Sequence, residues 1–217
     1  MPTVAETAGL LQARAPKRRA RRAARGALPA LFVMSDAARL PDPLAVVRHV
    51  PRGAAIILRH YGAPGRADLA RRLVEAARRR GVIVLVAGDW RLAVRTGAAG
   101  VHLPEAALKA PLALGAAVQA KKLFVTIAAH SLGAVFRAAR RGASAAIVGP
   151  VFPTPSHPGR AGLGAWRFAA LARQSPVPVI ALGGIDARSA RRLRDSGAAG
   201  LAGIGGIIGI GSGVRLV

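Results

Sequence analysis

Side chains that could transfer a proton or hold an anion follow several short apolar runs of this chain. His130 and Ser131 come directly after the run FVTIAA, where an imidazole could act as both acid and base near neutral pH. The segment VGPVFPTPSHPGRAGLG, residues 148–164, follows another run and contains Thr154, Ser156 and His157. Its prolines and glycines do not continue a strand or a helix, so it is either a loop over an anion or an ordinary connector.

Two glycine pairs, Gly183-Gly184 and Gly205-Gly206, also come directly after apolar runs. Glycine lets backbone N–H groups approach an anion, and the N-terminus of a following helix adds its dipole. The same residues would also permit a tight turn without any ligand. Neither turn contains a lysine or an arginine, so an anion held there would be bound mainly by backbone donors.

These residues need a scaffold that brings the ends of several apolar runs together. Eight runs are predicted to be strands, near residues 30–34, 54–58, 82–87, 99–103, 122–127, 144–149, 177–182 and 199–204. Helices are predicted between them, near residues 43–50, 66–80, 90–96, 105–118, 131–141, 164–174 and 186–196. Near-continuous β-branched runs indicate strands buried on both faces, as in a parallel sheet, and their alternation with helices predicts a single (β/α)8 TIM barrel.

A repeated junction supports this α/β assignment. RTGAAGVHL, RRGASAAIV and DSGAAGLAG each end a helix with glycine and lead into a strand. Because the active site of such a barrel is built at the carboxyl ends of its strands, the residues named above are expected to gather there. His102 is predicted to be an inward-facing structural residue, and Trp90 and Trp166 are predicted to pack at the starts of helices.

Length and composition fit one globular domain preceded by a basic extension. The chain has 217 residues, of which 52% are hydrophobic and 4% aromatic, and it contains no cysteine, which excludes disulfides and thiolate metal sites. No apolar run approaches the ~20 residues of a membrane-spanning helix, and we expect a cytoplasmic protein. Residues 1–28 are predicted to be a flexible basic extension, and residues 29–217 the barrel domain.

The net charge of +24 raises the question of nucleic-acid binding. Seven basic residues lie in RAPKRRARRAARGA, residues 14–27, and most of the others lie in helices, where they mark solvated faces. No aromatic residues alternate with them, so a dedicated nucleic-acid groove is not predicted. Weak contact of the extension with nucleic acid or acidic lipid stays open, as does an organelle transit peptide.

Several motifs together resemble one family. GPVFPTPSHPGRAGLG, PVIALGGI, GAAGVHLPE and AAHSLGAVFRAARRGA are similar to stretches of the thiamine phosphate synthase and TenI family, in the same order, over about residues 29–207. The resemblance implies a (β/α)8 barrel that binds a thiazole phosphate through Gly183, Gly184 and the last loop, with Thr154 and Ser156 in the loop over the ligand. The family usually has Ser-Ala before Ile in that last loop, where this chain has Gly205 and Gly206.

The synthases of the family join a pyrimidine diphosphate to the thiazole phosphate with Mg²⁺, and several of their residues are replaced here. Of the usual Gln-Leu-Arg-Glu-Lys motif, only Leu58 and Arg59 match. Gly88 and Ala107 stand where the synthases have their two metal-ligand aspartates, which leaves Asp89 and Glu105 as weak candidate ligands. The lysine of the flexible loop is replaced by His157.

The TenI branch of the family lacks that set of metal ligands, and its histidine before Ser-Leu isomerises a carboxythiazole phosphate. His130 matches that position, although it could also simply cap or pack against a helix. The resemblance therefore predicts a TenI-like thiazole tautomerase, without a cofactor. The alternatives are a thiamine phosphate synthase, a transferase that needs Mg²⁺ at a non-standard site, and a non-catalytic binder of thiazole or thiamine phosphate.

The partners expected on this basis are small. We expect a phosphate ligand, either thiazole phosphate or thiamine phosphate, with no specific nucleic acid and no membrane span. The sequence leaves a homo-oligomer open.

Overall fold

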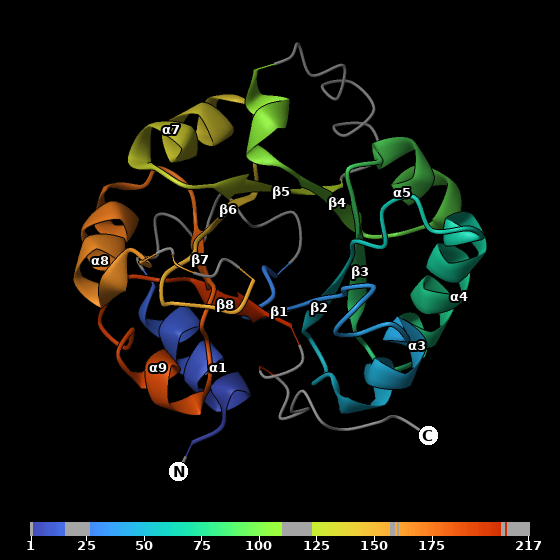
Figure 1. The fold of residues 1–217 in the computed structure, drawn as a ribbon, viewed down its shortest axis with the longest axis horizontal. Helices are drawn as coiled ribbons and strands as arrows, with labels where there is room; N and C mark the ends of the chain where they lie inside the picture. The colour runs from blue at the N-terminus through green and yellow to red at the C-terminus, as the bar shows by residue number, and fades with distance from the viewer. Residues whose placement is uncertain are drawn as a thin grey trace.

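Eight parallel strands close into a barrel in the computed structural model of the chain, which describes residues 2–15, 27–109, 123–156, 159, 161–204 and 207 (Figure 1). Each strand pairs with the next along the chain, and β8 pairs with β1 to close the ring. The strands are β1 (Leu31–Met34), β2 (Ala55–Leu58), β3 (Ile83–Ala87), β4 (Gly100–Leu103), β5 (Phe124–Ala129), β6 (Ala145–Val148), β7 (Val179–Leu182) and β8 (Gly200–Gly203). The predicted (β/α)8 barrel is confirmed, and every strand overlaps the run predicted for it.

Helices cover the outside of this barrel (Figure 1). They are α1 (Val4–Arg14), α3 (Pro43–Val46), η2 (Val47–His49), α4 (Arg66–Arg79), α5 (Trp90–Thr96), η3 (Glu105–Leu108), α7 (Leu132–Arg140), α8 (Gly164–Gln174) and α9 (Ala187–Arg191). The helix predicted over 186–196 is shorter than expected, because turn residues follow Arg191. The helix predicted over 105–118 begins with the 3-10 turn η3, and its residues from 110 onward lie outside the described part of the chain.

Side-chain caps determine where the helices after β1, β3, β5 and β7 begin. Asp42, Asp89, Ser131 and Asp186 each accept a hydrogen bond from a backbone N–H in the first turn of the following helix. These caps satisfy donors that the helix itself leaves unpaired. They also fix short strand-to-helix loops at the carboxyl end of the barrel, which is where the candidate site residues lie.

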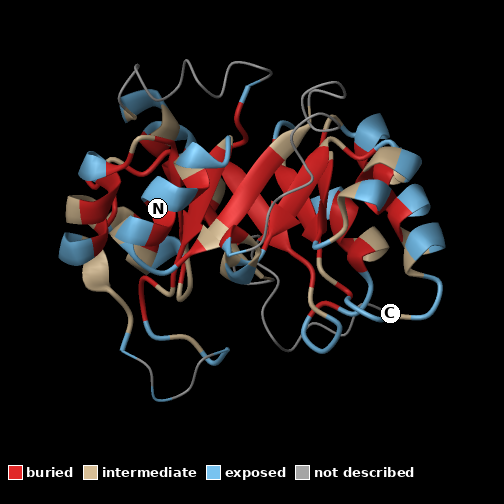
Figure 2. Ribbon diagram, turned by 90° about the horizontal axis from the view of Figure 1, so that it is seen from above, coloured by how far each residue is buried: buried red, intermediate tan, exposed pale blue. Residues whose placement is uncertain are grey.

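The strands separate two sets of buried apolar side chains. Val33, Ile56 and Val84 belong to a cluster that includes the buried faces of the surrounding helices. The alternating residues Phe32 and Ile57 belong to a second cluster, formed mainly by the strands, which fills the interior of the barrel. Figure 2 shows the buried strands at the centre and exposed helix faces at the periphery. The barrel is therefore packed solid, and ligands are expected at its carboxyl end rather than inside it.

Residues 4–14, predicted to belong to a flexible extension, instead form helix α1. Thr3 and Glu6 form a capping box at its start, and Val4, Ala8 and Leu11 are buried in the core cluster. The helix packs against α9 and β8 (Figure 1). The prediction is therefore wrong for these residues, while most of the basic run lies within residues 16–26, outside the described part of the chain.

In the described part of the chain, no helix combines the length and the apolar character needed to cross a membrane.

Candidate functional site

The loop after β6, residues 149–156, contacts three neighbouring loops at the carboxyl end of the barrel. The N–H of Val151 donates to the carbonyl of Leu182 at 2.8 Å, and the N–H of Phe152 donates to the carbonyl of Gly183 at 3.1 Å. Its first residue contacts His130 after β5, and Ser156 contacts Arg39 in the loop after β1. We call this end of the barrel the mouth and this segment the β6 loop. The structure therefore brings the predicted loop, histidine and glycine pair together.

Gly183 and Gly184 lie where the turn after β7 meets the β6 loop. Their φ angles are +96° and +62°, in the region that favours glycine. A Cβ on Gly183 would lie 2.8 Å from Cα of Pro150, and one on Gly184 would lie 2.6 Å from the carbonyl oxygen of Pro153. Close loop packing therefore requires both glycines, whether or not an anion binds.

The N–H groups of the glycine pair leave room for an anion. No group in the described part of the chain accepts a hydrogen bond from the N–H of Gly183 or of Gly184. At the N-terminus of α9, the N–H groups of Arg188 and Ser189 are not available to an anion, because both donate to the Asp186 carboxylate. The hydrogen bond from the backbone of Ser189 holds the pKa of Asp186 below its ordinary value. The second pair, Gly205 and Gly206, lies outside the described residues.

His130 is exposed at the mouth, directly after β5. Its Nδ1 lies 2.5 Å from the carbonyl oxygen of Gly149, the first residue of the β6 loop. A carbonyl oxygen only accepts, so Nδ1 carries the hydrogen and Nε2 of the neutral ring keeps its lone pair. In this tautomer Nε2 can accept a proton, so His130 could act as a base.

Glu105 anchors the backbone at His130. Its carboxylate accepts from the His130 N–H at 2.8 Å and lies 3.4 Å from the guanidinium of Arg137 on α7. From the sequence, Glu105 is predicted only as a weak candidate metal ligand. In the structure this carboxylate instead holds the start of the loop that carries the histidine.

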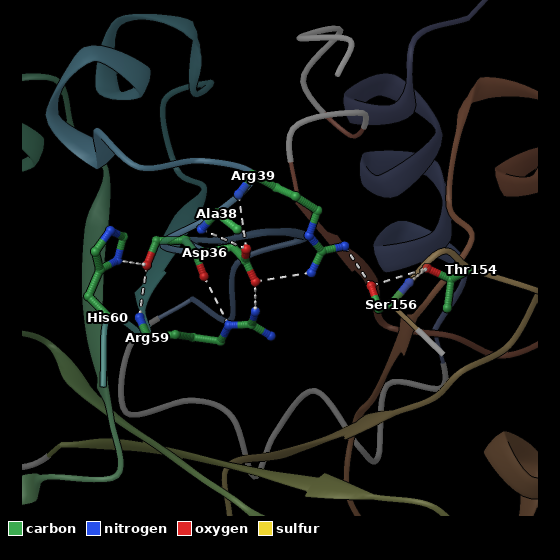
Figure 3. A network of polar contacts seen from close by, with 8 residues as sticks. Asp36, Ala38, Arg39, Arg59, His60, Thr154 and Ser156 are labelled. Atoms are coloured by element: carbon green, nitrogen blue, oxygen red, sulfur yellow. Dashed lines mark hydrogen bonds and ion pairs between the residues drawn. The ribbon is translucent and has the colours of Figure 1, made fainter. Parts of the chain in front are cut away.

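On the β1 side of the mouth, one carboxylate holds two guanidinium groups (Figure 3). Asp36 forms ion pairs with Arg39 at 3.0 Å and with Arg59. Arg39 also donates to Oγ of Ser156 at 2.5 Å, and Ser156 lies 3.3 Å from the hydroxyl of Thr154. This network joins the loop after β1 to the β6 loop, and it includes the predicted residues Arg59, Thr154 and Ser156.

The two arginines determine the charge of this network. The pKa of Asp36 is held far below its usual range, mainly by the hydrogen bond from the Arg39 side chain. The backbone hydrogen bond of Arg39 and the charges of both arginines contribute further. The carboxylate is therefore ionised at neutral pH. One negative charge against two positive charges leaves this side of the mouth net positive, which suits an anionic ligand.

The surroundings of His60 and His102 indicate structural rather than catalytic roles. Nε2 of His60 lies 3.1 Å from the carbonyl of Pro41 and Nδ1 lies 2.9 Å from Oγ of Ser35, so both ring nitrogens are engaged. His102 is buried in β4 beside Thr126. Burial, with a smaller contribution from the charge of Arg59, lowers the pKa of His102 to about 4, so its imidazole is neutral at physiological pH.

The residues at the positions of the family's metal ligands do not fit a magnesium site. Asp89 is occupied as the cap of α5, with its carboxylate accepting from Leu92 N–H at 2.8 Å, and Glu105 is engaged at His130. The ring of Tyr61 lies over Gly88, where an added Cβ would be 3.1 Å from Cε1 of that ring. Within the described ranges, no three acidic or histidine side chains cluster as metal ligands would.

A guanidinium group also contacts the end of β3. Arg66, at the start of α4, donates to the carbonyl of Ala87 at 2.5 Å, and its charge lies 5.5 Å from the centre of the Tyr61 ring. The place where the synthases carry a metal-ligand aspartate is therefore beside a fixed positive charge and covered by an aromatic ring.

Arg39 and the anchoring role of Glu105 were not predicted from the sequence, and His157 lies outside the described residues. Arg39 had no signal of its own, because its partner Ser156 is 117 residues away. Glu105 follows the motif VHLP directly, so its place at a strand end was visible, but its partner was not.

Comparisons with known proteins agree on one family. The family model described as "Thiamine monophosphate synthase" matches residues 31–207. The chain is 32% identical over 164 residues to a thiamine-phosphate synthase of Thioalkalivibrio sulfidiphilus, covering 73% of this chain and 77% of that protein. It is 34% identical over 184 residues to a thiamine-phosphate synthase of Mycobacterium avium, covering 77% of this chain and 81% of that protein.

Solved structures give the same result for the fold. A thiamine phosphate pyrophosphorylase from Pyrococcus furiosus superimposes with a TM-score of 0.69 and 27% identity, covering 82% of this chain and 87% of that one. FabK from Thermotoga maritima superimposes with a TM-score of 0.62 at 18% identity, covering 82% of this chain and 58% of that one, which is a likeness of fold alone.

Proposed function

The chain belongs to the thiamine monophosphate synthase family, and from that premise we propose that it binds a thiazole phosphate in the mouth and moves a proton on it through His130. The phosphate would be held by the N–H groups of Gly183 and Gly184. The heterocycle would then lie under the β6 loop, between the glycine pair and His130. This is the proton-transfer activity of the TenI branch of the family.

The observation that carries the proposal is the hydrogen bond from Nδ1 of His130 to the carbonyl of Gly149. It leaves Nε2 as the base. This nitrogen would take a proton from one position of the ligand, the electron pair of the broken bond would move into the conjugated ring, and the imidazolium would return a proton at another position. No atom is gained or lost, so the reaction needs no co-substrate.

Thiamine phosphate synthesis is the second candidate, and the names of the relatives favour it over the tautomerase. Arg59, retained from the synthase motif, would suit an anionic leaving group on the positive side of the mouth. We nevertheless place the tautomerase first, because the candidate magnesium ligands are not available. Asp89 and Glu105 are engaged in other hydrogen bonds, and Gly88 is covered by Tyr61. If the synthase reaction takes place, its magnesium would have to be held by other groups.

The test uses the purified full chain and both reactions in parallel. Isomerisation of carboxythiazole phosphate is followed by its ultraviolet absorbance, and thiamine phosphate formation is followed with pyrimidine diphosphate, thiazole phosphate and Mg²⁺. We expect isomerisation by the parent and a loss of about 10²-fold or more in His130→Asn, with ligand affinity retained.

The control is Ser131→Ala, which removes only the helix cap next to His130. It should cost about 1 kcal/mol of stability and leave turnover unchanged. Robust magnesium-dependent formation of thiamine phosphate, with no isomerisation, would reverse the order of the two candidates. Tight ligand binding without either reaction would support the non-catalytic binder instead.

A further inference from the structure

Outside the mouth, the groove between α8 and the segment after α9 has the features of a site for a nucleotide chain. We propose that it binds single-stranded nucleic acid without sequence preference. The groove has a volume of about 250 Å³ and is lined by Trp166, Arg173, Arg191, Arg192, Arg194 and Asp195. We call it the Trp166 groove.

Trp166 is 81% exposed, although the sequence predicted that it packs at the start of a helix. The prediction fails because α8 buries a different face, formed by Phe168, Leu171 and Ala172. Trp166 therefore contributes little to the core, and its exposed indole instead lines a groove together with arginines. An indole ring in this position can stack against a flat partner.

Among the described residues that line this groove, arginines outnumber carboxylates. The groove contains four arginines and one carboxylate, and that carboxylate, Asp195, already pairs with Arg14 at 3.0 Å. Arg192 is held over the ring of Phe152, with 5.0 Å between its guanidinium carbon and the ring centre. Arg173 donates to the carbonyl of Asp195 at 3.1 Å. The groove therefore has a positive field with two of its arginines positioned in advance.

An aromatic platform beside positive charge is the arrangement by which proteins hold single strands, because each base has a flat face and each backbone unit carries a charge. A base-paired duplex does not present free base faces to a side chain, so stacking on Trp166 selects for unpaired strands. The groove is smaller than a typical enclosed ligand pocket, so it fits one nucleotide of a longer chain better than a whole free ligand. The net charge of +24 adds long-range attraction for that chain.

A second copy of the protein is a poorer occupant. In a two-fold contact the same patch meets itself, so the arginines of one groove would face the arginines of the other. Like charges placed against each other oppose association. Charge complementarity thus favours a polyanion.

The test is fluorescence anisotropy of a labelled short oligouridylate titrated with the full chain. Trp166→Ala should weaken binding about tenfold, which is the loss of one stacked base, and Trp166→Phe should restore part of it. Phe136→Ala on α7 is the matched control, because Phe136 is also exposed, at 41%, and lies outside the groove. It should leave affinity unchanged.

A second pair of variants tests the charge. Arg194→Glu, in the groove, should weaken binding more than Arg95→Glu on α5, which lies on another side of the barrel (Figure 1). Both variants change the net charge equally, so a difference between them reports the location of the site. Binding should also weaken as salt increases.

Four results would overturn the proposal. The first two are equal affinities of Trp166→Ala and the parent, and equal losses of affinity in the two charge variants. The third is tighter binding of a duplex than of a single strand. The fourth is that free uridine monophosphate competes as well as the oligomer at equal nucleotide concentration. Self-association that is lost in Trp166→Ala, without any oligomer binding, would assign the groove to a protein interface instead.

Discussion

The two sides of the mouth differ in how far their polar groups are already engaged by neighbouring residues. Around β5 to β7, no described residue engages Nε2 of His130 or the backbone N–H groups of Gly183 and Gly184. Around β2 and β3, Tyr61 covers Gly88 and a guanidinium contacts the end of the strand. We call the first the open side, because the groups that we propose bind a phosphate and accept a proton have no partner among the described residues, and the second the filled side, because the positions of the family's metal ligands are taken by other groups.

The largest effect should come from a substitution on the open side, at Gly184. Gly184→Val places a Cβ 2.6 Å from the carbonyl oxygen of Pro153, which is too close, at a φ that valine rarely adopts. We expect thiazole phosphate affinity to fall ~100-fold or more, and stability to fall by about 2–4 kcal/mol because the β6 loop must move. Calorimetric titration and urea unfolding measure the two effects.

Gly142→Ala is the control for backbone strain. Gly142 has a φ of +76° but nothing lies within 4 Å of an added Cβ, so the substitution should cost about 1 kcal/mol and leave binding unchanged. If folded Gly184→Val binds the ligand as the parent does, the glycine pair serves only the turn and does not hold the phosphate.

On the filled side, His102 should make stability depend on pH. Its folded pKa of about 4 lies below its ordinary value of 6.5, so the unfolded chain binds the proton first as pH falls. The neutral form is favoured fully above about pH 6.5, and stability is lost between pH 6.5 and 4, by about 3 kcal/mol in total for this group.

Urea unfolding of the parent and of His102→Gln over that pH range measures this contribution, since glutamine cannot titrate there. The variant should lack most of the slope, although other groups such as Asp36 add their own loss at still lower pH. The same slope in both proteins would mean that the interior near Arg59 is not the dry, positive environment that the structure indicates.

A smaller effect should come from the link between the loops after β1 and β6. Ser156→Ala removes the hydroxyl that accepts from Arg39, and we expect ligand affinity to fall about three- to tenfold, the value of one ordinary hydrogen bond. Ser156→Thr keeps a hydroxyl and should retain most of the affinity. Equal losses in both variants would point to crowding of the β6 loop rather than to the hydrogen bond.

The sequence supported the barrel more fully than the site because strands and helices leave periodic signals, whereas contacts between distant loops do not. Eight apolar runs predicted β1 to β8, and resemblance selected His130, Gly183 and Gly184. The Arg39 to Ser156 hydrogen bond depends on how two loops meet in space. The role of Glu105 likewise depends on a partner 25 residues away.

Two errors had different causes. The sequence of helix α1 does indicate a helix, through the capping box of Thr3 and Glu6 and the spacing of Val4, Ala8 and Leu11. The neighbouring basic run led instead to the prediction of a flexible extension. Trp166 could not be placed from composition, because Phe168 two residues later determines which face of α8 turns inward.

The smallest expected effect is that of Mg²⁺, and it tests the contrast between the two sides most directly. The carboxylates nearest to the family's ligand positions already accept hydrogen bonds, Asp89 from the first turn of α5 and Glu105 from His130, and releasing either would leave a backbone donor unpaired. Arg66 adds a fixed positive charge at the end of β3, which opposes a divalent cation. Calorimetric titration of the full chain with thiazole phosphate should therefore give the same affinity with Mg²⁺ and with EDTA, and the melting temperature should not change. If Mg²⁺ instead raises the affinity of the parent but not of Asp89→Asn, the Asp89 carboxylate gives up its hydrogen bond to the first turn of α5 and binds the metal. The filled side would then contain a metal site.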